Sequence, residues 1–149
     1  MFQNVSNDSA LGYEQSQEQR VKILHIEDSP ADQTLARLSL KRGQLPCLLT
    51  TVDSLQATEA ALQVQNFDLI LADYRLRGHR TGHEAIAAIR ERTSQALPAI
   101  IITGDTAADQ LRNVHAGGTA LLHKPVVPGE LHSAIGALLR GSEWYLVQQ

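Results

Sequence analysis

The sequence predicts an α/β fold, a doubly wound parallel sheet of five strands with five helices in three layers, α/β/α. Two observations lead to this prediction. Short, continuous apolar runs, typical of strands buried on both faces, alternate along the chain with segments of helical periodicity. The links between them are short and are marked by turn and capping residues such as Ser29 and Pro30. This alternation favours a parallel sheet covered by helices on both faces.

The apolar runs predict the positions of the strands. We place them at 21–26, 46–52, 67–74, 98–103 and 119–123. The third, Phe67–Tyr74, is the strand around which the fold is organised, because it ends in Asp73 and is followed by a polar loop. Right-handed crossovers favour the strand order 2-1-3-4-5, in which the first and third strands are neighbours.

The segments between the strands have the apolar spacing and the end signals of helices. We expect helices from Ser29 to Gly43, from Asp53 or Ser54 to Val64, from Thr81 or Gly82 to Arg92, from Gly104–Thr106 to Gly117, and from about Pro128 to Arg140.

The 149 residues, 43% of them hydrophobic, suit one globular domain. We expect this domain at 21–141, between a flexible polar tail at 1–20 and a C-terminal tail at 142–149. A net charge of −3 argues against a general nucleic-acid binder. The apolar runs are too short to cross a membrane, no signal-peptide pattern is present, and the single Cys47 cannot form an intrachain disulfide. A cytoplasmic location is therefore expected.

Side chains suited to chemistry stand where the predicted strands end. Glu27 and Asp28 follow the first strand, Asp73 ends the third, Thr103 ends the fourth and Lys124 follows the fifth. Because the carboxyl ends of parallel strands share one edge of a sheet, these residues should meet. Crowded carboxylates favour a cation between them, and oxygen ligands suit Mg²⁺. With Lys124 added, such a site would stabilise a phosphoryl group, for which an Asp carboxylate can be the acceptor.

Four segments, HIEDSP, ILADYRLRG, IIITGD and LLHKPV, resemble the receiver domain of two-component response regulators. The resemblance covers about Val21 to Arg140 and depends on the order and spacing of the segments, because a single Glu-Asp or Lys-Pro is a weak signal. It implies a flavodoxin-like fold. The segments DYRLRG, TG and LLHKP look most like those of receivers at the C-terminal end of hybrid histidine kinases.

The resemblance also implies a role for each matching residue. The residues that act on the phosphoryl group would be the acceptor Asp73, the switch hydroxyl of Thr103 and the contacting Lys124. The Mg²⁺ ligands would come from Glu27, Asp28, Asp73 and the backbone carbonyl of Arg75. The bond between Lys124 and Pro125 is expected to be cis.

Two positions depart from the family pattern. Leu121 stands where many receivers have the Tyr or Phe that swings inward on activation, so an aromatic switch is not expected. Thr81 precedes Gly82 where Asp-Gly is common. Backbone motion around 103–109 must then transmit more of the signal.

The expected function is a signalling module and not an enzyme. It would take a phosphoryl group from the phosphohistidine of a histidine kinase and act by contact with a downstream protein, since no DNA-binding segment follows the domain. We expect a homodimer or a kinase partner on the 105–140 surface. A phosphorelay intermediate that passes phosphate to a phosphotransfer protein, and a receiver detached from a hybrid kinase, remain alternatives.

Enzymes of similar fold are the other class considered. An aspartyl-phosphate phosphatase would want a second acid two residues after its nucleophile, where this chain has Arg75. A nucleotide-binding protein would want a Gly-rich loop after the first strand, where this chain has Glu27 and Asp28. Both are therefore disfavoured.

Overall fold

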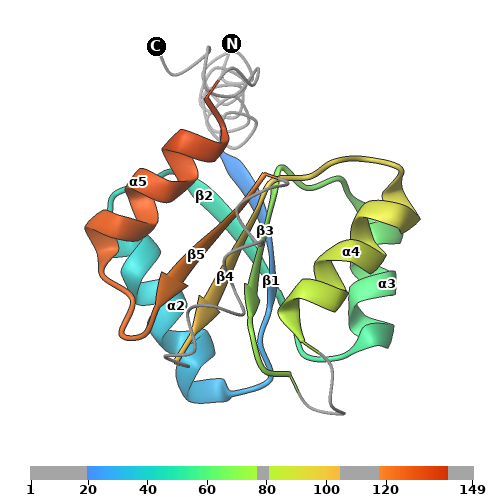
Figure 1. The fold of residues 1–149 in the computed structure, drawn as a ribbon, viewed down its shortest axis with the longest axis horizontal. Helices are drawn as coiled ribbons and strands as arrows, with labels where there is room; N and C mark the ends of the chain where they lie inside the picture. The colour runs from blue at the N-terminus through green and yellow to red at the C-terminus, as the bar shows by residue number, and fades with distance from the viewer. Residues whose placement is uncertain (1–19, 77–80, 105–117, 141–149) are drawn as a thin grey trace, which may run out of the picture.

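The structure, a computed structural model, describes residues 20–76, 81–104 and 118–140. Its strands form one parallel sheet in the predicted order β2-β1-β3-β4-β5 (Figure 1). The strands are β1 (Val21–Ile26), β2 (Cys47–Val52), β3 (Leu69–Asp73), β4 (Ala99–Thr103) and β5 (Thr119–His123). The bounds of β1 and β5 are those predicted, and β2, β3 and β4 are slightly shorter than predicted.

Four helices lie in the described ranges: α2 (Pro30–Arg42), α3 (Leu55–Val64), α4 (Gly82–Thr93) and α5 (Pro128–Leu138). The side chains of Ser29, Ser54 and Thr81 each accept a backbone N–H of the following helix at 3.1–3.3 Å, which explains where α2, α3 and α4 begin. The helix predicted from Gly104–Thr106 to Gly117 falls almost wholly outside the described residues. None of the described helices is long and apolar enough to cross a membrane.

Helices α2 and α5 cover one face of the sheet, and α3 and α4 cover the other (Figure 1). Alternate residues of β3 serve the two cores: Leu69 and Leu71 pack toward α2 and α5, whereas Ile70 and Ala72 pack toward α3 and α4. All four are fully buried, which is why the sequence of this strand is continuously apolar.

The loop after β3 folds back on the strand it leaves. Arg75 pairs with Thr81 in an antiparallel bridge, and the Gly82 N–H donates to the carbonyl oxygen of Tyr74 at 2.7 Å. A Cβ on residue 82 would clash with the carbonyl oxygen of Asp73, so only glycine allows this close approach. The start of α4 is thereby held against the end of β3, next to Asp73.

Candidate functional site

The register of the sheet brings the predicted residues to one edge. Asp73 lies opposite Ile102, and Thr103 lies opposite His123, so the ends of β3, β4 and β5 are level. Backbone hydrogen bonds of 2.8 Å, from Tyr74 to Ile102 and from Lys124 to Thr103, continue this pairing to the strand ends. The structure thus places Asp73, Thr103 and Lys124 together at the carboxyl edge of the sheet.

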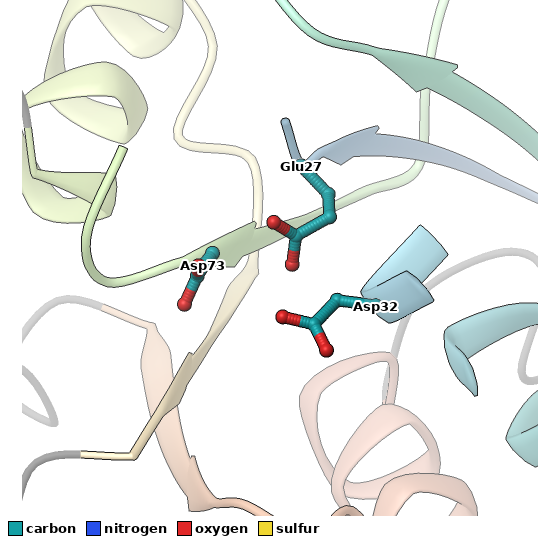
Figure 2. A group of neighbouring side chains, drawn as sticks. All are labelled: Glu27, Asp32 and Asp73. Carbon is teal, nitrogen blue, oxygen red and sulfur yellow. The ribbon is translucent and has the colours of Figure 1, made fainter. Parts of the chain in front are cut away.

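Three carboxylates gather at this edge, those of Glu27, Asp32 and Asp73 (Figure 2). They follow β1, lie in the first turn of α2 and end β3, respectively, and one oxygen of each lies within 4.8 Å of the others. Figure 2 shows the three carboxyl groups pointing toward a common space. A set of only carboxylate oxygens fits a hard divalent cation such as Mg²⁺.

Lys124 supplies a positive charge beside these acids. Its Nζ lies 2.9 Å from Oδ2 of Asp32 and 3.4 Å from Oδ1 of Asp73. Burial acts to lower the pKa of Lys124, but the hydrogen bond to Asp32 and the charge of Asp73 outweigh it and raise this pKa overall. Lys124 is therefore a permanent cation shared by two carboxylates. The peptide bond between Lys124 and Pro125 is cis, as expected.

The surroundings of Glu27 and Asp73 disfavour the charged form of each carboxyl group. Burial raises the pKa of the Glu27 carboxyl to about 7, and the charge of Asp73 acts in the same direction, while the N–H of Ser29 opposes it from 3.2 Å. Burial also raises the pKa of Asp73, in spite of the charge of Lys124 and its hydrogen bond. A further cation at this edge would stabilise the charged form of both carboxyl groups.

Thr103 and Arg75 lie beside Asp73 and Lys124, whereas Glu27 and Asp32 line a neighbouring cavity. Thr103 and Arg75, with Asp73, Gly104 and Lys124, line a cavity of about 400 Å³ at the ends of β3 and β4. Thr103 is buried, with 1% of its surface exposed. The cavity thus combines a carboxylate, a hydroxyl and an ammonium group.

Asp28 is the predicted residue that lies outside the carboxylate cluster formed by the described residues. It is half-buried and lines a separate small cavity together with Asp53 and Ser54, on the side of α3 and α4. Its role as a Mg²⁺ ligand stays a prediction.

Asp32 is the residue that the sequence analysis missed. It stands three residues after the N-cap Ser29, a position where an acid is expected to reach back to the cap. Its backbone N–H does bond to the Ser29 hydroxyl at 3.3 Å, but its carboxylate pairs with Lys124 instead. The usable signal was an acid in the first turn of a helix that starts at the active edge of the sheet.

Residues 23–136 match the family described as the response regulator receiver domain. The chain belongs to this family. No curated protein sequence matches the chain.

Solved structures of receivers have the same fold. The chemotaxis response regulator CheY4 of Vibrio cholerae is 23% identical with a TM-score of 0.67, covering 80% of this chain and 99% of that chain. A receiver domain protein from Clostridium thermocellum is 21% identical with a TM-score of 0.69, covering 83% and 97%. The receiver domain of a signal transduction histidine kinase from Syntrophus aciditrophicus is 22% identical with a TM-score of 0.67, covering 83% and 92%.

Proposed function

We propose that this receiver accepts a phosphoryl group on Asp73 from the phosphohistidine of a histidine kinase. The observation that supports this is the placement of the Asp73 carboxylate: it ends β3 at the sheet edge, with Lys124 Nζ 3.4 Å away and the acids Glu27 and Asp32 beside it. In a chain of the receiver family, this edge is the place where a phosphoryl group would be bound.

The transfer is a displacement at phosphorus. A carboxylate oxygen of Asp73 forms a bond to phosphorus, and the bond between phosphorus and the imidazole nitrogen breaks. The electron pair of the broken bond stays on the imidazole, which can then take up a proton. Lys124 and the Thr103 hydroxyl would each donate to a phosphoryl oxygen and stabilise the charge on the transferred group.

The proposed ligands of Mg²⁺ are the carboxylates of Glu27, Asp28 and Asp73 and the backbone carbonyl of Arg75. When bound, the ion would neutralise charge on the phosphoryl oxygens. The raised pKa values of Glu27 and Asp73 support a site that favours an added cation. The ion is hydrated strongly, so we expect weak binding unless phosphate is present.

The output is proposed to be contact with another protein. The 105–140 surface proposed for a partner or homodimer includes α5, while 105–117 lie outside the described residues. Leu121, which replaces the usual aromatic residue, is half-buried and packs against the core on the side of α3 and α4. We therefore propose that the loops after β4 and β5 transmit the signal by backbone motion.

The same chemistry would serve a phosphorelay intermediate or a receiver detached from a hybrid kinase, and the resemblance to hybrid-kinase receivers stays a prediction. We propose a cytoplasmic location for this function. The protein would promote only its own phosphorylation and dephosphorylation.

Intact mass after incubation with Mg²⁺ and acetyl phosphate tests the proposal. Wild-type protein should gain one phosphoryl group, and Asp73→Asn should gain none. Glu59→Gln, which removes an acid on the surface of α3, serves as the matched control and should be phosphorylated like wild type. An adduct on Asp73→Asn, or none on wild type, would refute the assignment.

A further inference from the structure

The ammonium group of Lys124 is closer to Asp32 than to the proposed phosphoacceptor. Its Nζ lies 2.9 Å from Asp32 Oδ2 and 3.4 Å from Asp73 Oδ1. Asp32 is fixed in the first turn of α2, where its own N–H bonds to the Ser29 side chain. The pair therefore links the start of α2 to the end of β5 and directs part of the bonding capacity of Lys124 away from Asp73.

We propose that Asp32 is a positioning residue that holds Lys124 in the unphosphorylated receiver and competes with the phosphoryl group for it. This inference rests on the proposed function. A phosphoryl group on Asp73 brings new acceptor oxygens and negative charge to the side of Asp73 that faces Lys124. Because Lys124 carries a single positive charge, a charge-assisted bond from its ammonium group to such an oxygen competes with the bond to Asp32. Asp32 thus opposes the phosphorylated state and sets how easily it forms.

If Asp32 were a metal ligand, removing its carboxylate would have the opposite effect on binding of a phosphoryl mimic. The Asp32 carboxylate also lies within 4.8 Å of oxygens of Glu27 and Asp73, so it could assist in holding a cation. Removing a ligand weakens binding of Mg²⁺ and of any phosphoryl mimic that depends on it, whereas removing a competitor for Lys124 strengthens binding of the mimic. The sign of the effect distinguishes the two roles.

The test is a titration with beryllofluoride at saturating Mg²⁺, followed by the ¹⁹F NMR signal of the bound mimic. Wild type is compared with Asp32→Asn, with Asp32→Glu, which keeps the charge, and with Glu59→Gln. Glu59 is a matched control because it forms an ion pair of the same length, 2.9 Å to Arg92, on the surface of α3 and α4. The Asp32→Asn change is also made in a Lys124→Ala background, and Mg²⁺ affinity is measured separately for every variant.

Asp32→Asn should bind the mimic about two- to fivefold more tightly than wild type, the range expected for a partly exposed ion pair. Asp32→Glu should return toward wild type, Glu59→Gln should not change, and the gain should shrink or vanish in the Lys124→Ala background. Unchanged or weaker binding by Asp32→Asn, or a gain that persists in full without Lys124, overturns the inference alone. If wild type itself binds no mimic, the proposed function fails as well.

Discussion

Two ion pairs of the same length lie in very different surroundings. Lys124 and Asp32 meet at 2.9 Å at the carboxyl edge of the sheet, where the side chains are 32% and 30% exposed. Arg92 and Glu59 also meet at 2.9 Å, between α4 and α3, with side chains 48% and 42% exposed. Distance alone would rank the two pairs as equal.

The neighbours of each pair make the difference. Asp73 and Glu27 crowd the first pair, and the pKa of each is raised, so any change of charge there alters several groups together. The side chains of Glu59 and Arg92 are more exposed, so water screens their attraction. Charge at the sheet edge is thus coupled and tied to the proposed chemistry, while the charges of Glu59 and Arg92 are screened more strongly by water.

Asp28 is relevant to both regions, and its substitution should have the largest effect on phosphorylation. It follows Glu27 in sequence, but it lines a cavity shared with Glu59 and Arg92. If it belongs to the sheet-edge site, Asp28→Asn should lower Mg²⁺-dependent phosphorylation by about tenfold or more, with the fold retained. A rate of acetyl phosphate labelling equal to wild type across a Mg²⁺ titration would instead assign Asp28 to the α3 and α4 surface.

His25 is a titratable residue in the core, on β1 two residues before Glu27. It is 2% exposed, and burial lowers its pKa to about 4, with Arg37 acting in the same direction and Asp32 against it. An unfolded His binds a proton below about pH 6.5, whereas the folded one resists it. Stability that is present above pH 6.5 should therefore be lost as the pH falls toward 4, by about 3 kcal/mol.

Urea unfolding of wild type and His25→Gln between pH 7.5 and 4.5 measures this loss. The variant keeps a polar side chain near Thr51, whose hydroxyl lies 3.2 Å from His25 Nδ1. The stability of wild type relative to the variant should decline as the pH falls. A constant difference over that range would show that His25 does not resist protonation.

The sequence predicted much of this arrangement and missed one part for a physical reason. The strand positions follow from continuous apolar runs, and the starts of α2, α3 and α4 follow to within a residue from polar residues before helical periodicity. The meeting of Asp73 with Lys124 follows from parallel topology. The pairing of Asp32 with Lys124, which are 92 residues apart, depends on how α2 is set against β5, and no local pattern records that.

Glu27 should show a pH dependence opposite to that of His25. Its pKa is raised to about 7, so the folded protein takes up a proton more readily than the unfolded chain. Its contribution to stability is fully present below the unfolded pKa of about 4.5 and is lost as the pH rises through 7. In buffer with a chelator, Glu27→Gln should therefore gain on wild type as the pH rises from 4.5 to 8, by about 2 kcal/mol. Parallel pH curves of unfolding free energy for the two proteins would contradict the raised pKa.

The smallest effect should come from the exposed pair of Glu59 and Arg92. In a double-mutant cycle with Glu59→Gln and Arg92→Gln, the coupling free energy of unfolding should be below about 1 kcal/mol, because solvent competes for both charges. It should fall further when the salt concentration is raised from 0.05 M to 1 M, a change that shortens the screening length to about 3 Å. The corresponding cycle for Asp32→Asn and Lys124→Ala should retain more of its coupling in high salt, since these side chains are less exposed and Lys124 also faces Asp73. If salt lowered the two coupling free energies equally, the different surroundings of the two pairs would not affect their strength.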